Sequence, residues 1–591
     1  MKIEGIFALD KPLGITSQRA VQIVKYWARR NTGNKKIKVG HAGTLDPLAS
    51  GVLVVGIGRE YTKDLDNIVK SEKEYLAEIT LGEVSETDDA EGQKTIVNKD
   101  RIPSEKEIEK SIKKFTGNIK QIPSAYSAVK IDGEEAYKKA RRGEDVEMKE
   151  REVFIKNIDL LSYEYPKIKI RVTCGKGTYI RTLARDIGDI LETGAFLSGL
   201  ERTRVGDFLL KDAKDLKEFS MNIAIHATEL DNEKIDGTRV YISEVLNRLG
   251  SLASDDDFYL YHKDEFNDKL KPKETDNYKI KKIFKFPMWT QTVFAWNIFS
   301  KKPDVLWMPF HNIPFLKNKK TKIVITIHDL AFKLFPETFT KKDLWKLDFL
   351  TDNAVKKSDR IIAVSKSTKK DLLKFYPWLN EKKITVVHHG IDEGLWQKEI
   401  TENEKKKVLT KYNLDSQDYI VHTGTIQPRK NLVRLVEAFE ILRKKKQKLK
   451  LVLIGGNGWL YENIRKRASE SEFASDIIFT GNIDIEDVRI LMKNAKVFVL
   501  PSLYEGFGLP GLEAMAVGVP VVAAKNSSIP EVLGDTAIYF DAENSKECAE
   551  KIKEVINNTQ LRGEMIEKGL KRVKKFTWEK CARNTLRVLR K

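Results

Sequence analysis

Two patterns of apolar and polar positions divide the chain near residue 220. From Met221 onward, short apolar runs rich in β-branched residues alternate with helical segments, which is typical of βαβ units. Because the runs are almost entirely apolar, we expect buried parallel strands with helices on both faces of the sheet. The expected strands are 222–226, 322–328, 360–364, 384–388, 419–423, 450–454, 477–480, 497–500 and 519–523.

The strand pattern also predicts the domain organisation. A charged stretch at 400–407 separates two groups of strands, which indicates two doubly wound α/β domains, 221–402 and 403–591, facing across a cleft. Residues 1–220 instead mix alternating strand patterns, at 74–81 and 167–173, with helical segments at 104–115 and 182–191, and we expect an α+β domain. Residues 217–220 form no Pro- or Gly-rich linker, so the junction resembles two genes read as one.

Composition narrows the class of protein. A length of 591 residues requires several hydrophobic cores, and 41% hydrophobic with 32% charged residues excludes a disordered chain. Three widely separated cysteines, Cys174, Cys548 and Cys581, exclude a disulfide scaffold and argue against a zinc site. Glu4 and Asp10 come too early for a signal peptide, and no apolar run is long enough to span a membrane. We therefore expect a cytoplasmic protein.

The net charge of +19 does not locate a nucleic-acid site. Residues 1–220 carry 40 Lys and Arg against 36 Asp and Glu, whereas residues 221–591 carry 65 against 50. Most of the excess positive charge therefore lies in the second part, and its distribution must decide which surface binds an anionic partner.

The densest local motif in the first part is GHAGTLDPLASGVL at residues 40–53. Glycines at 40, 43 and 51 mark sharp turns or close backbone approaches, and Asp46-Pro47 is a turn initiator. Considered alone, this spacing favours an ordinary surface turn at Asp46.

Residues 41–53, however, resemble the catalytic motif of the TruB family of tRNA pseudouridine synthases. Four further segments resemble motifs of the same family in the same order: KPLGITS at 11–17, KEY at 73–75, IPSAYSAVK at 122–130 and GKGTYIRTL at 175–183. Five motifs in order argue strongly for membership and for a functional Asp46.

The resemblance implies isomerisation of uridine 55 in the T loop of tRNA, without cofactor or metal. Asp46 matches the family's covalent nucleophile, and Arg181 matches the arginine that pairs with it. The target base must leave the RNA stack, and Tyr75 matches the residue that stacks on the flipped base. His41 matches a histidine that holds the opened T loop. Without the resemblance, Tyr75 and His41 would be interpreted as packing residues.

Candidate RNA-binding residues follow from basic and aromatic positions near these motifs. Residues 137–143 interleave Lys and Arg with Tyr and Gly, which suits a phosphate backbone, although a solvated helix face is the alternative. The candidates are Lys11, Lys176, Tyr179, Arg141 and Arg142. Many family members continue into a small C-terminal RNA-binding domain, whereas this chain passes directly to Met221.

Two clusters in the last domain indicate a site for a nucleoside diphosphate. The strand 419–423 is followed by a loop with adjacent cations, Arg429 and Lys430, and then by a helix, which favours an anion near the helix N-terminus. After the strand 497–500, Glu505 and Glu513 lie on either side of a Gly-rich turn. Open α/β sheets bind ligands at the carboxyl ends of their strands, where both clusters lie.

This Glu-x7-Glu pattern with the upstream Arg-Lys pair resembles the retaining glycosyltransferases of family 4 over residues 221–591. The resemblance implies a GT-B fold and metal-independent transfer of a hexose from a GDP or UDP sugar to a glycan or lipid-linked acceptor. In that scheme Arg429 and Lys430 neutralise the diphosphate, Glu513 holds the ribose hydroxyls and Glu505 faces the donor sugar. The amides that cradle the diphosphate belong to Gly506, Phe507, Gly508 and Leu509. No obligate protein partner is implied.

His328 ends the expected strand at 322–328, and the family has a histidine there near the reacting sugar. A hydrolase is rejected because no nucleophile elbow accompanies His328-Asp329. Residues 237–239 resemble the family's acceptor-side loop but contain fewer glycines.

A basic aromatic segment at 278–296 allows two interpretations. It is either a face for an anionic membrane or a strand and helix that pack in the core. We favour the core because Trp289, Val293 and Trp296 recur at helical spacing.

The sequence thus predicts a bifunctional chain. The rival hypotheses are a non-catalytic tRNA-binding module, a nucleotide-sugar-binding regulator, and a fusion that is not a functional unit. The presence of Asp46, Glu505 and Glu513 favours catalysis.

Overall fold

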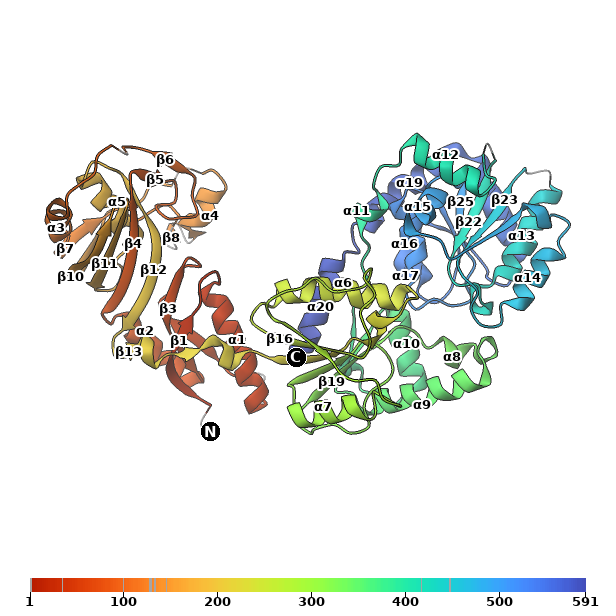
Figure 1. Cartoon of the computed structure of the whole chain (residues 1–591), viewed down its shortest axis with the longest axis horizontal. Coiled ribbons are helices and arrows are strands. Elements are labelled where there is room, and N and C mark those ends of the chain that lie inside the picture. Colours follow the sequence, from red (N-terminus) through yellow and green to blue (C-terminus); the bar gives the residue numbers. More distant parts are fainter. Residues whose placement is uncertain are drawn as a thin grey trace. The chain divides into compact units, whose positions relative to one another are not determined.

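The computed structural model describes residues 3–34, 36–98, 100–126, 130–131, 134–144, 146–415, 417–445 and 448–591. The chain forms two compact units, Met1–Ser220 and Met221–Lys591 (Figure 1). Each unit has its own hydrophobic clusters. Within the described residues, no helix combines the length and the apolar character needed to cross a membrane.

The first unit is built on one large, mainly antiparallel sheet. Its strands are β1 (Gly5–Lys11), β2 (Val39–Ala42), β3 (Ala49–Ile57), β4 (Lys73–Leu81), β7 (Gly117–Gln121), β10 (Arg151–Glu164), β11 (Lys167–Cys174), β12 (Ala195–Val205), β13 (Phe208–Leu209) and β14 (Lys214–Asp215). The order is β14-β1-β3-β12-β4-β11-β10-β7, with β2 beside β3 and β13 beside β12. Only the pairs β1–β14 and β3–β12 are parallel within this sheet as described.

Alternation along the central strand β4 explains which face of this sheet is covered. Every second residue of β4 from Lys73 to Leu81 is buried, so Tyr75 points to the same side as Ala77 and Ile79. Helices pack on the sheet, and two short strand pairs form separate two-stranded sheets. These elements are α1 (Ser17–Thr32), α2 (Arg59–Val69), α3 (Glu105–Lys113), α4 (Ala136–Arg141), α5 (Ile180–Ile190), β5 (Glu83–Ser85), β6 (Lys94–Ile96), β8 (Lys130–Ile131) and β9 (Glu134–Glu135).

The first lobe of the second unit is a parallel sheet of short buried strands. They are β15 (Asn222–His226), β16 (Asp257–His262), β17 (Tyr278–Lys282), β18 (Val305–Met308), β19 (Lys322–Ile327), β20 (Arg360–Ala363) and β21 (Ile384–Val386). Their order is β17-β16-β15-β18-β19-β20-β21. Its helices are α6 (Gly237–Leu252), α7 (Val293–Lys301), α8 (Ala331–Leu334), α9 (Lys341–Lys357), α10 (Lys366–Phe375) and α11 (Glu393–Trp396). The hydrophobic cluster on one face of this sheet includes α6, and that on the other includes α7, α9 and α10.

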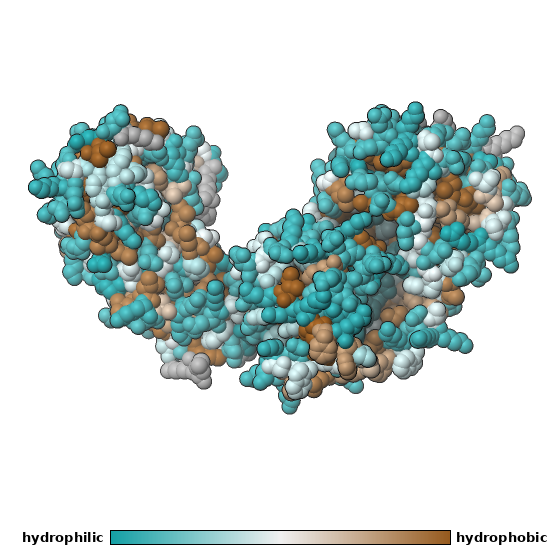
Figure 2. Space-filling view, in the orientation of Figure 1, coloured by the Kyte–Doolittle hydropathy of each residue, from teal (hydrophilic) through white to brown (hydrophobic). Residues whose placement is uncertain are grey.

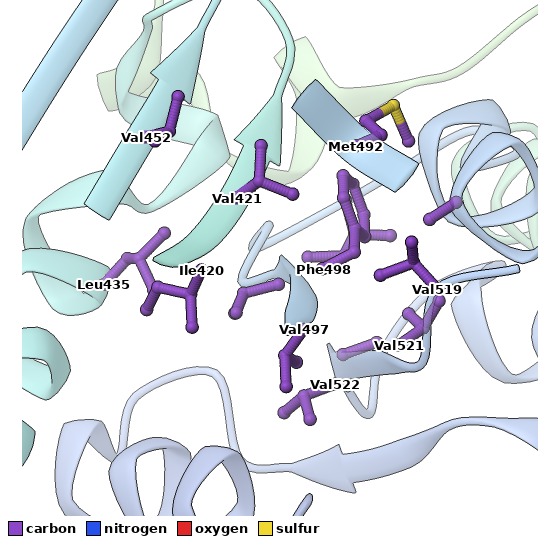
Figure 3. Packing of buried hydrophobic residues seen from close by; sticks show 14 of the residues in the cluster. Ile420, Val421, Leu435, Val452, Met492, Val497, Phe498, Val519, Val521 and Val522 are labelled. Carbon is purple, nitrogen blue, oxygen red and sulfur yellow. The ribbon is translucent and has the colours of Figure 1, made fainter. Parts of the chain in front are cut away.

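The second lobe repeats this architecture with a second parallel sheet. Its strands, in the order β24-β23-β22-β25-β26-β27, are β22 (Tyr419–Thr423), β23 (Lys450–Ile454), β24 (Ile477–Gly481), β25 (Val497–Leu500), β26 (Val521–Ala524) and β27 (Ile538–Phe540). The main helices are α12 (Glu402–Lys411), α13 (Leu432–Lys444), α14 (Glu462–Ser469), α15 (Ile485–Lys493), α16 (Leu509–Ala516), α17 (Ile529–Leu533), α18 (Ser545–Asn557) and α19 (Thr559–Val573). Figure 3 shows strand residues such as Val421, Phe498 and Val522 packing between these helices.

The chain ends in the first lobe, which corrects the expected domain boundary. Helix α20 (Trp578–Leu589) packs against α6, and Trp578 and Leu589 belong to the hydrophobic cluster of the first lobe. The expected domain 403–591 therefore includes a helix that is structurally part of the domain 221–402. Gly390 lies directly against the start of α20. A Cβ at this position would be 2.1 Å from the Trp578 amide nitrogen, so the close approach requires glycine.

Candidate active sites

Asp46 lies in the loop between β2 and β3, and its neighbours are fixed. The Ser17 hydroxyl accepts a hydrogen bond from the Leu45 amide and donates one to the Leu45 carbonyl, both at 2.8 Å. On the other side, the Gly14 amide donates to the Pro47 carbonyl at 2.8 Å. The Asp46 carboxylate is thus held in position while its side chain stays 49% exposed.

Arg181, in the first turn of α5, lies between two carboxylates. One guanidinium nitrogen is 2.6 Å from Asp46 Oδ2, and another is 2.6 Å from Asp89 Oδ2. Asp89 is buried and accepts hydrogen bonds from the Thr87 hydroxyl and the Glu91 amide. The buried Asp89 therefore orients Arg181 toward the accessible Asp46. The sequence analysis did not select Asp89. The only sequence feature at this position is the pair of consecutive aspartates, Asp88 and Asp89.

A cavity of about 320 Å³ opens beside Asp46. Its walls come from the Asp46 loop, β4, the start of α5 and β12. The lining residues are Gly43, Thr44, Leu45, Asp46, Val69, Lys73, Tyr75, Ser124, Tyr126, Gly175, Lys176, Gly177, Thr178, Tyr179, Ile180, Arg181, Thr182, Leu200 and Arg202. Four of the family-matched motifs meet here, and the cavity presents a carboxylate, aromatic rings and cations to one ligand.

Tyr75 and Arg202 form one wall of this cavity. Tyr75 is buried, and burial raises the pKa of its phenol, so the ring is neutral near pH 7. Arg202, also buried, donates to the carbonyls of Val52 at 2.7 Å and Gly43 at 3.0 Å. Arg202 thereby ties β12 to the Asp46 loop, a structural role that the sequence did not reveal.

The predicted site residues His41 and Lys11 lie outside the lining of this cavity. His41 is on β2 and is not among the residues that line the cavity; burial, with the nearby Arg202, lowers its pKa. Lys11 is fully buried, and its ammonium donates to the carbonyls of Pro12 and Ile15. The prediction that Lys11 contacts RNA is therefore wrong, since the enclosed ammonium stabilises the turn that contains Gly14. Burial lowers the pKa of Lys11 to about 8.

The other predicted RNA-binding residues differ in setting. Lys176 and Tyr179 line the cavity, and the Gln121 side chain bonds both the amide and the carbonyl of Tyr179. Arg142 is exposed but forms ion pairs with Glu134 at 2.7 Å and Glu144 at 2.6 Å. The side chain of Arg141 and motif residues 127–129 lie outside the part of the chain that the structure describes.

The second unit brings Arg429, Lys430 and Glu505 together at the carboxyl ends of β22 and β25. Lys430 Nζ is 2.6 Å from Glu505 Oε1, the Arg429 guanidinium is 3.4 Å from Oε2, and the Ser502 hydroxyl donates to Oε1 at 2.6 Å. Burial alone would raise the pKa of Glu505, but the two cations lower it to about 2. The expected diphosphate-binding cations are therefore oriented by a carboxylate that stays ionised.

The Gly-rich loop before α16 contacts the predicted histidine. A Cβ on Gly506 would lie 1.9 Å from the His328 carbonyl oxygen, so only glycine allows this approach. Gly508 has φ +91° and precedes α16, whose first residue is Leu509. The amides of 506–509 and His328 thus lie at the same place between the lobes. Phe507 packs against the His389 ring at 4.9 Å between centroids.

Glu513 differs from Glu505 in both partners and protonation. It lies within α16, and in the part of the chain that the structure describes its carboxyl group has no hydrogen-bond or ion-pair partner. Burial raises its pKa to about 7, with Lys430 opposing the shift. A carboxyl group that lacks a protein partner is available to a ligand hydroxyl.

His328 is held as a neutral ring beside the Gly-rich loop before α16. Its Nε2 lies 2.9 Å from the Pro309 carbonyl, and burial lowers its pKa. The ring lies 5.1 Å from Tyr241 and 5.6 Å from His389 between centroids. His389, which the sequence analysis did not select, is buried, and both of its ring nitrogens lack a hydrogen-bond partner in the structure as described.

Polar contacts join the two lobes across this site. Glu531 of α17 accepts hydrogen bonds from the Lys366 and Ser367 amides at the start of α10 and lies 2.7 Å from His388 Nε2. The Tyr504 hydroxyl donates to Asp371 of α10 at 2.6 Å. The two parallel sheets therefore present their strand ends to one shared site.

Both sites define enzyme classes, and comparison with known proteins agrees. The model of the TruB family pseudouridylate synthase (N terminal domain) matches residues 29–180, and that of the tRNA pseudouridylate synthase B C-terminal domain matches 181–251. The latter match ends in α6, beyond the first unit. The Glycosyltransferase Family 4 model matches 252–395, and the Glycosyl transferases group 1 model matches 403–572.

Curated relatives place the first unit in its family. The chain is 46% identical over 214 residues to tRNA pseudouridine synthase B of Phocaeicola vulgatus, covering 36% of this chain and 91% of that protein. It is 39% identical over 254 residues to tRNA pseudouridine synthase B of Clostridium kluyveri, covering 42% of this chain and 85% of that protein. The chain belongs to the TruB family through its first unit, and its second unit is similar to the glycosyltransferase families whose models match it.

Solved structures confirm the predicted fold of the second unit. Sucrose-phosphate synthase from Thermosynechococcus elongatus aligns with a TM-score of 0.50 and 17% identity, covering 63% of this chain and 98% of that chain. The glycosyltransferase WaaG aligns with a TM-score of 0.50 and 14% identity, covering 62% and 99%. The prediction of an α+β pseudouridine synthase unit followed by a GT-B unit is confirmed.

Proposed function

We propose that the first unit converts uridine 55 in the T loop of tRNA to pseudouridine. The observation that supports this most directly is the Asp46–Arg181–Asp89 arrangement beside a cavity with Tyr75 on its wall. A flipped uridine would stack on Tyr75 with its ribose near Asp46, and Lys176 at the cavity would contact the RNA backbone.

The proposed chemistry uses the carboxylate as a nucleophile. Asp46 forms a bond to ribose C1′ while the C1′–N1 bond breaks, and the uracil leaves as an anion. After the base rotates, C5 bonds to C1′ and Asp46 is released. The C5 proton is lost and N1 gains a proton, so the product is an isomer of the substrate. Arg181 keeps Asp46 oriented throughout.

The test is Asp46→Asn in the full chain, with a T-arm stem-loop as substrate. Isomerisation should fall below detection, because an amide cannot act as the nucleophile, while binding of the stem-loop stays within a few-fold. Residual turnover within tenfold of the parent would remove Asp46 from this role. A stem-loop with cytidine at the target position reports binding without reaction.

We also propose that the second unit transfers a hexose from a GDP or UDP sugar to a glycan or lipid-linked acceptor with retention of configuration. Arg429 and Lys430 would hold the diphosphate as the sugar C1–O bond breaks, with the amides of 506–509 adding hydrogen bonds. The acceptor oxygen then bonds to C1 and its proton passes to the leaving phosphate. Glu513 would accept the ribose hydroxyls, and His328 would contact the sugar.

This proposal predicts that divalent cations are dispensable, since Arg429 and Lys430 provide the positive charge. Transfer, or slow hydrolysis of the donor, should be unchanged in EDTA; loss of activity that magnesium or manganese restores would contradict it. Lys430→Ala should weaken UDP or GDP binding and turnover together by several kcal/mol. Lys444→Ala, at an exposed position of α13, is the control.

The two proposed reactions share no substrate, and both use compounds of the cytoplasm. We therefore place the protein there, with tRNA and a nucleotide sugar as its partners.

A further inference from the structure

Aromatic and apolar side chains are exposed on one side of the first lobe of the second unit. We call this surface the α7–α9 face, because α7 and α9 cover the same side of the sheet. Its exposed members come from the segment after β17, from α7, from the segment after β18 and from α9. They are Phe284, Phe286, Met288, Trp296, Phe299, Phe315, Leu316, Trp345 and Phe349.

Contacts between these segments show that the α7–α9 face is continuous. Phe315 lies 5.9 Å from Phe349, and Phe349 stacks on Trp345 at 5.9 Å between centroids. The Gln291 side chain, between Met288 and α7, accepts from the Phe315 amide at 2.8 Å and donates to the Ile313 carbonyl at 2.9 Å. The part around α7 and the part around α9 are therefore fastened to one another.

The degree of exposure is unusual for such large side chains. Trp345 is 73%, Met288 70% and Trp296 64% exposed, so whole rings and a thioether face solvent. In the second lobe, the exposed large apolar side chains of the described residues are Leu460 and Ile485. Figure 2 shows brown and pale atoms along the edge of the lobe where Figure 1 draws α7. Contiguous apolar surface of this kind indicates a binding surface.

The prediction that Trp289, Val293 and Trp296 pack together in the core is wrong for Trp296. Helix α7 begins at Val293, so Trp289 precedes the helix and is buried by the turn, stacked on Phe294. Trp296 then lies on the outer side of α7. It stacks on Phe299 at 6.2 Å between centroids.

The charge around these side chains is mainly positive, although α9 also contains Asp343, Asp348 and Asp352. Residues 278–303 contain six lysines and no Asp or Glu, and residues 305–328 contain four lysines and no Asp or Glu. Along β17, Tyr278 packs in the cluster on the α6 side, whereas Ile283, just after the strand, packs in the cluster on the α7 side. By alternation Lys279 and Lys281 point to the α7 side.

We propose that the α7–α9 face binds the surface of an anionic phospholipid bilayer. Interfacial proteins combine Trp and Phe side chains that enter the acyl boundary with lysines that remain among the headgroups, and this face has both. Apolar contacts would hold the lobe and the lysines would select anionic lipid. An RNA partner is disfavoured because Met288 and Leu316 offer no stacking surface to a base.

The α7–α9 face lies near the candidate transferase site, so membrane binding would bring that site close to the bilayer. The segments after β17 and β18 leave the same edge of the sheet as His328, which follows β19. If the proposed transfer is correct, a lipid-linked acceptor would reach the cleft from the bilayer; membrane binding itself does not depend on that activity.

The test is co-sedimentation of the full chain with vesicles of phosphatidylcholine alone or mixed with phosphatidylglycerol. We expect binding only with phosphatidylglycerol, weakened by added salt. The double variant Trp296→Ser/Trp345→Ser should bind at least about tenfold more weakly. Replacing Lys279 and Lys281 by Gln should cost about fivefold per charge.

Matched controls separate this surface from general effects. Phe154→Ser removes an exposed aromatic of the first unit, and Lys574→Gln with Lys575→Gln removes two exposed charges of the second lobe. Both should bind vesicles like the parent. UDP and GDP binding, measured separately, should be equal in the parent and all of these variants, so a failed transferase proposal would be recognised by its own assay.

Three results would overturn the proposal. The first is a parent protein that stays in the supernatant with anionic vesicles at low salt. The second is a self-association, seen by sedimentation velocity, that the tryptophan variant abolishes while vesicle binding is unaffected. The third is a tryptophan variant that loses binding of unfractionated tRNA but retains vesicle binding, which would assign the face to RNA.

Discussion

Arg181 is shared by two carboxylates that differ in accessibility. Asp46 is half exposed at the cavity, whereas the side chain of Asp89 is 2% exposed and is bonded to Thr87 and Glu91. The two carboxylates have different roles because only one is buried. Asp89 orients the Arg181 guanidinium, and the guanidinium in turn orients the Asp46 carboxylate. Contact with two carboxylates at once requires the several nitrogens of a guanidinium, whereas a lysine side chain has only one nitrogen.

Asp89→Asn should therefore slow isomerisation without abolishing RNA binding. An amide keeps the shape but loses the charge that orients Arg181, and misplacement of Asp46 can cost about a hundredfold in rate. Single-turnover assays with a T-arm stem-loop measure the rate, and filter binding measures affinity. Asp159→Asn, at an exposed position of β10, is the control. An unchanged rate in Asp89→Asn would show that Arg181 needs no second anchor.

Two glutamates eight residues apart have opposite protonation behaviour. Glu505 has a pKa of about 2 because Lys430 and Arg429 outweigh its burial, whereas burial without an ion pair raises that of Glu513 to about 7. The sequence predicted that both would bind the donor but could not distinguish their charge, which depends on which carboxylate the cations face.

The raised pKa of Glu513 predicts a pH-dependent cost to stability. At a pH well below the usual pKa of 4.5, the carboxyl group is protonated in both the folded and the unfolded state, so it does not affect the free energy of unfolding. As the pH rises from 4.5 to about 7, the group ionises in the unfolded state but not in the folded state, which destabilises the fold. Above about pH 7 this destabilisation is complete. Glu513→Gln should thus be increasingly more stable than the parent through this interval. Thermal unfolding over pH measures this difference, and a pH-independent difference would contradict the pKa. Glu554→Gln, at an exposed position, is the control.

The turn between β25 and α16 depends on glycine for a steric reason. Gly506→Ala should abolish sugar transfer and lower the melting temperature, because its Cβ would lie 1.9 Å from the backbone oxygen of His328, which cannot move aside. Gly563→Ala is the matched control: it lies in α19 with nothing within 4 Å of its Cβ and should gain about 0.5–1 kcal/mol from helix propensity. Full activity in Gly506→Ala would show that the lobes separate at this point during turnover.

Several strands of the second unit were predicted with the bounds that the structure has, and others were missed. The expected strands at 222–226, 419–423, 450–454 and 497–500 have the bounds of β15, β22, β23 and β25. The edge strand β17 contains three lysines and was not among the apolar runs, although the favoured interpretation of segment 278–296 included a strand; the internal strands β16 and β18 were missed. An edge strand has one neighbour only and tolerates charge, so the apolar-run criterion does not detect it.

The motifs predicted the residues of the candidate sites, but not the residues that hold those site residues in position. Asp46, Arg181, Tyr75, Lys430 and Glu505 lie where their motifs meet. Asp89 and Arg202 act through contacts between segments far apart in the sequence, and such contacts exist only after folding. The return of α20 to the first lobe is of the same kind, since its amphipathic pattern does not say which core it joins.

Each unit completes its own core up to the junction. Phe219, in the short helix Leu216–Phe219, stacks on Phe7 at 5.4 Å and contacts Trp27 at 5.1 Å, within the first unit. Met221 is buried in the first lobe of the second unit, and its amide donates to Asp256 at 3.0 Å. One residue, Ser220, therefore connects two cores that end on either side of it.

We therefore expect the pieces 1–220 and 221–591, expressed separately, to fold and to keep their activities within a few-fold of the joined chain. A free amino group at Met221 would meet the Asp256 carboxylate, which already accepts from its amide, so the new terminus should not destabilise the second unit. Isomerisation, donor hydrolysis and thermal unfolding of each piece measure this. A piece that is insoluble or inactive alone and is rescued by adding the other would contradict it, because rescue requires a contact surface that neither core needs.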